Sequence, residues 1–203
     1  MSCDIDCRPL VKPCSLAKRQ LPDSLLNFAS EHIWGLIKSY SPKREERRGR
    51  YSKREPVILP EFMFYMHRIN SRGGISPLIM ILAMIYVFRI KKRLLPNGVG
   101  GYGFCHKIFT ACILIACKFL HGGHGAGEWG EEWQDLRRLD HGKTSHLPLT
   151  SRAMSKLGGY VFSCSEINLM ERVLLQLLNF DVLVRPDEIV TFLQEHRKDL
   201  CAP

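Results

Sequence analysis

Residues 108–120 read IFTACILIACKFL, and this stretch decides the class of the fold. Its apolar residues follow one another without the alternation of apolar and polar positions that marks a half-buried strand. Glycines lie on both sides of it, at 98–103 and at 122–123. The pattern therefore predicts a helix from about residue 103 to residue 121, with ACILIAC (111–117) at its centre.

The sequence before this helix predicts three more helices. Ser76-Pro77 supplies an N-cap residue and a proline at the first helical position, so a helix should run from there to about Leu95. It is apolar nearly all round, which is typical of a helix in the middle of a bundle. A shorter helix is expected at about 60–70, ended by Gly73-Gly74, and an earlier one from Asp23 or Ser24 to near Ser41-Pro42.

The sequence after it predicts a short helix at about 150–157 and a helix from a Ser165 cap to about Asn179. A last helix should begin near Pro186-Asp187. No strand pattern of useful length and no internal repeat is found. We expect an all-α bundle of about five core helices with a flanking helix at each end.

The chain has 203 residues, which suits one domain with tails. The expected divisions are described by residue number. They are a disordered or loosely attached tail (1–21), an N-terminal helix and basic linker (22–55), the main bundle (56–185) with a long insertion (122–149), and a C-terminal helix and tail (186–203).

Composition favours a globular protein of a reducing compartment. Apolar residues make up 45% and charged residues 24% of the chain. The longest apolar run, Leu78 to Phe88, is too short for a membrane span, which needs roughly 20 residues. No secretory signal is apparent. We expect the four cysteines that lie in apolar helical patterns to be reduced; they are Cys105, Cys112, Cys117 and Cys164. The expected location is the nucleus and/or the cytoplasm, with no membrane contact.

Basic residues are concentrated in two places. The formal net charge is +9, and residues 43–54 (KREERRGRYSKR) contribute much of it. A second cluster holds Arg89, Lys91, Lys92 and Arg93. Each cluster can be a solvated surface. The more specific alternatives are that it is a nuclear-import signal or that it binds an acidic partner or a nucleic acid.

Two charged residues interrupt apolar stripes. Lys118 shares a helical face with Ala111, Leu114 and Ile115, and Glu171 shares one with Ile167, Leu174 and Leu178. A buried unpaired charge costs several kcal/mol, so each needs water or a partner. Either the lysine reaches solvent and the glutamate lies at the rim of its stripe, or the two helices lie side by side and the charges meet at the edge of the bundle. In the second case they offer a donor and an acceptor to another protein.

Several of these features together resemble the cyclin box. IFTACILIACKFL resembles its third helix, and EINLMERVLLQLLNFDVLV (166–184) resembles its fifth helix and the segment that follows. More narrowly, the chain resembles the Pho-type (P/U-type) cyclins of fungi and protists. The motifs that carry this are IYVFRI (85–90), His106-Lys107, Gly158-Gly159 and the Glu-x-Asn-x-x-Glu of 166–171.

The resemblance implies a function and a set of site residues. It implies a regulatory subunit that binds and activates a cyclin-dependent kinase by holding the αC helix of that kinase in the active position. Residues at the positions of family kinase contacts are Lys118 and Glu171, with Ile115, Phe119, Phe180 and Val182 as apolar anchors. The implied partner is a cyclin-dependent protein kinase, with no cofactor and no small-molecule substrate. The resemblance leaves the pathway open between nutrient signalling, morphology and the cell cycle.

The chain departs from the family pattern at three places. Acidic residues often follow the lysine–aromatic pair in the family, but Leu120, His121 and Gly122 follow it here. The insertion at 122–149 is much longer than the usual turn. EFMFYMHRI (61–69) stands where mitotic cyclins carry the MRAIL sequence that docks substrates, which argues against docking of the mitotic type.

Rival functions find less support in the residues. A zinc site would need Cys112, Cys117, His121 and His124, but the two cysteines point about 140° apart on a helix, so we expect no metal. A cyclin-fold nucleic-acid-binding or transcription-factor-like module is the main alternative, although the basic residues lie mostly in a linker with few aromatics. No phosphate-binding glycine loop and no nucleophile–base signature is found, so we do not expect an enzyme.

Overall fold

Helix α4 (Phe104–His121) lies at the centre of the molecule. The computed structural model describes residues 21–36, 59–94, 101–121, 133 and 149–200. Within these residues every regular element is a helix, which confirms the all-α class. The other helices are α1 (Asp23–Trp34), α2 (Phe62–Gly73), α3 (Pro77–Arg93), α6 (Ser151–Leu157), α7 (Cys164–Leu177), α8 (Pro186–Glu195) and α9 (Arg197–Leu200).

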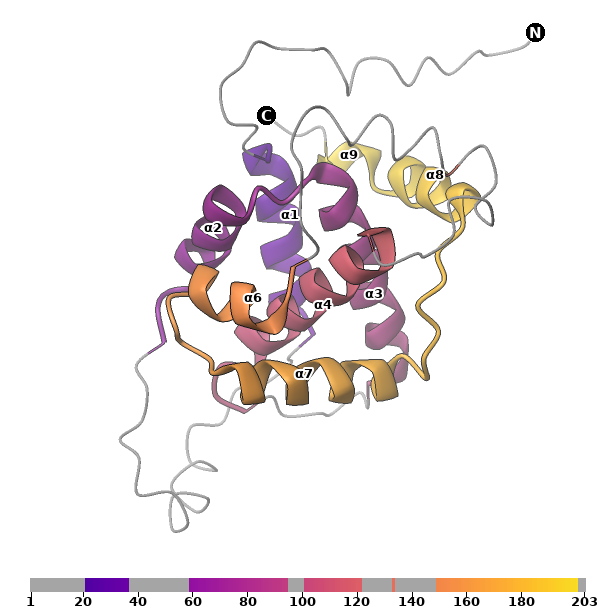
Figure 1. The fold of residues 1–203 in the computed structure, drawn as a ribbon. Coiled ribbons are helices and arrows are strands. Elements are labelled where there is room, and N and C mark those ends of the chain that lie inside the picture. The colour runs from indigo at the N-terminus through magenta and orange to yellow at the C-terminus, as the bar shows by residue number, and fades with distance from the viewer. Residues whose placement is uncertain (1–20, 37–58, 95–100, 122–132, 134–148, 201–203) are drawn as a thin grey trace, which may run out of the picture.

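The helices are arranged around α4 as Figure 1 shows. Helix α4 packs against α1, α2, α3, α6 and α7. Its side chains are buried on almost every side, and Ile113, Leu114 and Ala116 have no exposed surface. Each fully buried Leu or Ile contributes about 1.5–3 kcal/mol relative to an exposed one, so this helix supplies much of the core.

Helix α3 is buried as its sequence predicts, but the central position belongs to α4. Helix α3 packs between α1, α4 and α8, and this three-sided cover explains why its first three turns are apolar nearly all round. Its start is confirmed: the Ser76 hydroxyl accepts a hydrogen bond from the Ile79 amide at 3.2 Å, with Pro77 at the first helical position.

Three predicted helix boundaries were wrong. The first helix ends at Trp34 with Gly35 as its C-cap, well before Ser41-Pro42, and it begins after Pro22 without a side-chain cap. The cap of α7 is Ser163 rather than Ser165, because Ser163 forms a capping box with Glu166 three residues later. The amide of Ser163 donates to the Glu166 carboxylate at 2.8 Å, and the Glu166 amide donates back to the Ser163 hydroxyl at 3.3 Å.

The C-terminal helix divides in two. Helix α8 begins at Pro186, as predicted, and ends at Glu195 with His196 as its C-cap. The short α9 follows and packs against α1, so the two ends of the described chain lie together. Leu21 lies in the segment expected to form a tail, but it is only 4% exposed and belongs to the core.

The described cysteines are thiols and not members of disulfides. Burial raises the pKa of the Cys105 thiol to about 11 and raises that of Cys112 further, so both stay protonated. Cys164 departs from the expectation of a buried residue: it is the first residue of α7 and is partly exposed. Helix α4 has the length and hydropathy of a membrane span, but 72% of it is buried inside the bundle, as in the core helix of a globular protein.

Several expectations fall on residues outside the described part of the chain. These are most of the tail at 1–21, the basic linker at 43–54, and the insertion at 122–149 apart from Trp133 and Leu149.

Candidate functional site

The two charges that interrupt apolar stripes meet at the edge of the bundle. Helices α4 and α7 pack side by side, and the Lys118 ammonium lies 2.5 Å from a carboxylate oxygen of Glu171. The Lys118 side chain is 45% exposed, whereas that of Glu171 is 16% exposed. The pairing alternative is therefore the correct one: Glu171 continues the inward face of α7, and Lys118 covers it from the last turn of α4.

This ion pair contributes little to the stability of the isolated chain. Because Lys118 remains in contact with water, solvent screens the attraction, and such pairs are worth about 0.2–1 kcal/mol. Lys118 is also well placed near the C-terminal end of its helix, where positive charge is favoured. A pair that contributes so little to folding is available for another role, because the 45% exposed Lys118 keeps further ammonium donors at the surface of the bundle.

The chain leaves α7 through a turn that exposes an aromatic ring. The Asn179 amide donates to the Gln176 carbonyl at 2.9 Å, and the Phe180 amide donates to the Leu175 carbonyl at 2.8 Å. These bonds form a Schellman motif, in which asparagine often takes the left-handed position that Asn179 occupies here with φ of 54°. Phe180 also has a positive φ, of 57°, and its side chain is 65% exposed.

The remaining expected anchors lie at different depths. Ile115 is only 4% exposed and lies in the core of the isolated chain. Phe119 is partly buried and packs edge-to-face against Trp133, with ring centroids 5.6 Å apart. Val182 is partly buried, and its carbonyl accepts a hydrogen bond from Tyr86 at 2.8 Å. The exposed apolar surface near the turn comes instead from Phe180 and from Leu183, which is 62% exposed and was missed by the sequence reasoning.

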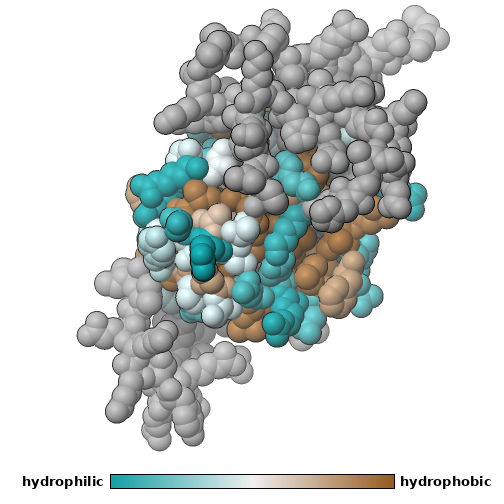
Figure 2. Space-filling model, in the orientation of Figure 1, coloured by the Kyte–Doolittle hydropathy of each residue, from teal (hydrophilic) through white to brown (hydrophobic). Residues whose placement is uncertain are grey.

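The surface around these residues mixes apolar and polar groups. Figure 2 shows hydrophobic side chains reaching the surface of the described bundle between hydrophilic ones. On α7, Leu169 and Val173 are 57% and 45% exposed and lie one turn apart. Each has an apolar neighbour in the sequence, so apolar runs alone do not separate these exposed residues from buried ones. A helical projection around Glu171 places both on the opposite, outward face.

The second basic cluster is only partly a free surface. Arg89 has a 17% exposed side chain and forms an ion pair with Glu188 at 2.7 Å, and Arg93 lies 3.8 Å from Asp181. Lys91 and Lys92 are exposed, and the Lys91 ammonium lies 5.9 Å from the centre of the Phe88 ring. Two of the four basic residues that suggested an acidic partner, Arg89 and Arg93, therefore form ion pairs with acidic residues of this chain.

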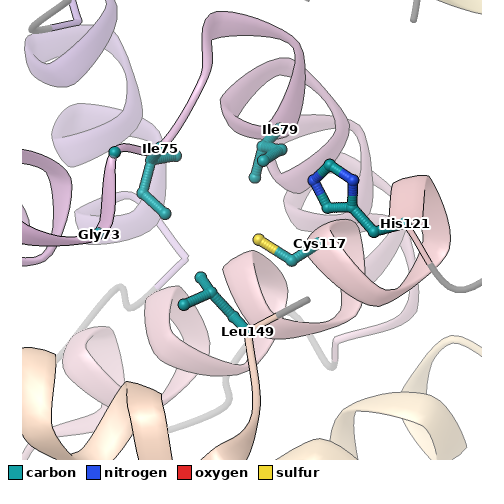
Figure 3. A pocket seen from close by; sticks show the side chains of 7 residues that line it. Gly73, Ile75, Ile79, Cys117, His121 and Leu149 are labelled. Carbon is teal, nitrogen blue, oxygen red and sulfur yellow. The ribbon is translucent and has the colours of Figure 1, made fainter. Parts of the chain in front are cut away.

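A small cavity lies beside the last turn of α4. It measures about 20 Å³ and is lined by Ile75, Ile79, Cys117, His121 and Leu149 together with Gly73 and Gly74 (Figure 3). A space of this size holds about one water molecule. Among the described residues, no three Cys, His, Asp or Glu side chains lie close enough to share a metal ion. Of the four residues that a zinc site would need, His124 lies outside the described residues.

Comparison with known proteins identifies relatives for most of the chain. The family model for the cyclin N-terminal domain matches residues 40–183. A curated relative, PHO85 cyclin-1 of Saccharomyces cerevisiae, is 24% identical over 179 residues. That match covers 88% of this chain but only 55% of the relative, so the chain spans about half the length of the curated relative. No solved structure gives a significant match.

Proposed function

The chain belongs to the cyclin family, and on this premise we propose that it binds a cyclin-dependent protein kinase and activates it as a non-catalytic regulatory subunit. The relative named above is called a Pho85 cyclin, which agrees with the resemblance to Pho-type cyclins. The first kinase to test is therefore the counterpart of Pho85 in the organism from which this chain comes. The kinase supplies every catalytic group, and this chain supplies binding energy.

The observation that carries the proposal is the Lys118–Glu171 pair, which joins the last turn of α4 to α7 at the edge of the bundle. The pair contributes little to folding, yet it puts a donor and an acceptor at the edge of the bundle. Phe180 lies farther along the same chain segment with an exposed ring. A few charges beside aromatic and aliphatic groups that become covered together are the composition of an interface hot spot.

Activation follows from the needs of a protein kinase. Its β3 lysine must pair with a glutamate of its αC helix, and its DFG aspartate must hold magnesium. A partner that binds only the arrangement with αC turned inward shifts the population toward that arrangement. Moving a kinase from 1% to 99% active requires about 10⁴-fold tighter binding to the active form. We propose that contacts of Lys118, Glu171 and Phe180 with the region of αC provide this preference.

The test is purification of the chain with candidate cyclin-dependent kinases, followed by a kinase assay. The chain is compared as wild type, Lys118→Glu and Glu171→Lys. The matched control is Lys198→Glu, which reverses an exposed lysine on α9, at the opposite end of the molecule from α7 (Figure 1). Circular dichroism and thermal unfolding show that each variant is folded.

We expect one kinase to bind and to be activated by the wild type and by Lys198→Glu, while each reversal at the pair abolishes binding of the folded chain. Binding that survives both reversals would remove the pair from the interface. Failure of every kinase to bind the wild-type chain would count against the proposed function, and salt-dependent binding to DNA would then be measured for the nucleic-acid alternative.

A further inference from the structure

One face of α3 holds the chain segment that follows α7. Tyr86, Arg89 and Arg93 are three or four residues apart, so their side chains lie on the same side of this helix. The Tyr86 hydroxyl donates to the Val182 carbonyl at 2.8 Å. The Arg89 guanidinium donates to the carbonyls of Asp181 and Leu183, each at 2.8 Å. Side chains of α3 therefore bind three successive carbonyls of a segment more than 90 residues later in the sequence.

The same face also binds the two helices on either side of that segment. Arg93 donates to the Leu177 carbonyl at 3.2 Å, in the last turn of α7. Arg89 donates to both carboxylate oxygens of Glu188, at 2.7 and 2.9 Å, in the first turn of α8. The planar guanidinium suits this task because its several donors point in fixed directions toward different acceptors.

The segment needs such support because it begins with an unfavourable backbone conformation. Asn179 tolerates a positive φ, but a bulky residue such as Phe180 rarely adopts one. Residues in this region persist only where their surroundings impose the conformation. The carbonyls of residues 181–183 lie outside any helix, so no helical amide bonds to them and their donors must come from side chains or water. The donors from α3 bond to these carbonyls, and the same bonds hold the backbone that follows Phe180 in place.

We infer that Tyr86 and Arg89 are positioning residues for the kinase-binding surface, because they hold the segment 181–183 and thereby fix the turn that exposes Phe180. This inference rests on the proposed function and deepens it. It also gives a role to IYVFRI (85–90), whose tyrosine and arginine the proposed function leaves without one. Neither residue needs to touch the kinase: Tyr86 is fully buried and Arg89 largely so.

The variants separate this role from general stability. Tyr86→Phe removes only the hydroxyl that binds Val182. Tyr65→Phe is the matched control: it removes an equally buried hydroxyl whose partner, the Thr110 hydroxyl at 2.7 Å, lies in the core away from the turn. Arg89→Lys keeps a positive charge near Glu188 but cannot reach two carbonyls at once. Glu188→Gln weakens the ion pair and leaves the bonds of Arg89 to both carbonyls in place.

The first measurement needs no kinase. Hydrogen exchange is followed in the full chain by mass spectrometry for peptides covering residues 178–184, where the amides of Phe180 and Asp181 bond within the turn. We expect faster exchange in Tyr86→Phe and Arg89→Lys than in the wild type, Tyr65→Phe or Glu188→Gln. Unchanged exchange in Tyr86→Phe and Arg89→Lys, or an equal increase in Tyr65→Phe, would overturn the inference that α3 holds the turn.

The second measurement is the dissociation constant for a kinase that binds the wild type. The loss of one hydrogen bond that orders the turn should weaken binding about fivefold to tenfold in Tyr86→Phe, with no change in Tyr65→Phe. Equal affinities for these two variants would overturn the role in kinase binding. Failure of the wild type to bind any kinase would instead overturn the proposed function, and the exchange result alone would then decide whether α3 fixes the turn.

Discussion

Neutralising Glu171 tests the site with little disturbance of the fold. Glu171→Gln keeps the size and shape of the side chain and removes its charge. In the isolated chain the partner Lys118 is 45% exposed, so water stabilises the unpaired ammonium. The loss should be about 0.2–1 kcal/mol in the free energy of unfolding. For a chain of 203 residues, 1 kcal/mol corresponds to about 2–4 °C in Tm, so the variant should melt within about 4 °C of the wild type.

The effect on kinase binding should be much larger. A kinase that covers the pair removes the water that stabilises Lys118 in the variant. Truncating one partner of a buried, hydrogen-bonded charge pair costs about 2–5 kcal/mol. That range corresponds to roughly 30-fold to 5,000-fold weaker binding. The large ratio between the binding loss and the stability loss is the signature of a pair that acts at an interface.

Isothermal titration calorimetry of Glu171→Gln, Lys118→Met and the double variant measures this ratio. The double variant should bind better than the sum of the two single losses predicts, by about 0.5–3 kcal/mol, because neither charge is left unpaired. Glu195→Gln, at the exposed end of α8, is the control for loss of a glutamate charge. A Glu171→Gln protein that binds within threefold of the wild type would refute the assignment of the pair to the interface.

Further predictions concern the fold that carries the site. Gly159→Ala should lower the free energy of unfolding by about 1–3 kcal/mol, because Gly159 has φ of +73°, a backbone conformation that L side chains rarely adopt; the Arg68 guanidinium must also move away from the new Cβ. Gly101→Ala, where a Cβ meets open space, should not lower it in the same denaturant titration, and equal losses would contradict the argument. Leu114→Ala should cost about 2.7–5 kcal/mol by urea unfolding, since its side chain is fully buried, and a cost below 1 kcal/mol would show a loosely packed core. Burial lowers the pKa of His106 in the folded chain from its ordinary 6.5, so the unfolded chain binds the extra proton and stability falls as the pH drops below about 6.5. His106→Gln should flatten this part of the stability curve measured by denaturant unfolding at several pH values, and an unchanged slope would assign it to other groups.

The periodicity of the sequence was sufficient to predict where most of the helices lie. Each predicted helix is present in the described chain, because apolar spacing and cap residues act within a few residues of one another. The errors lie at helix ends. Two serines two positions apart compete to cap α7, and the choice of Ser163 depends on the reciprocal bond with Glu166.

Part of the candidate site was also visible in the sequence. Lys118 and Glu171 stand out because a charge in an apolar stripe is costly unless it has a partner. Their motif context indicated the cyclin family, which the match of residues 40–183 to the cyclin N-terminal domain shows. Periodicity left open whether the two charges meet, because it fixes the face of a helix on which a residue lies but not the neighbour that the face touches.

Only the tertiary structure decided how the site is held together. The distance of 2.5 Å between the charges depends on how α4 and α7 pack. The exposure of Phe180 depends on a left-handed turn and on donors from Tyr86 and Arg89, which lie more than 90 residues earlier. By itself, the sequence determined the helices and the residues that do not fit them, because those signals are local. The contacts between α3 and the segment after α7 had to come from the fold, because side-chain donors reach main-chain carbonyls only once the helices have packed together.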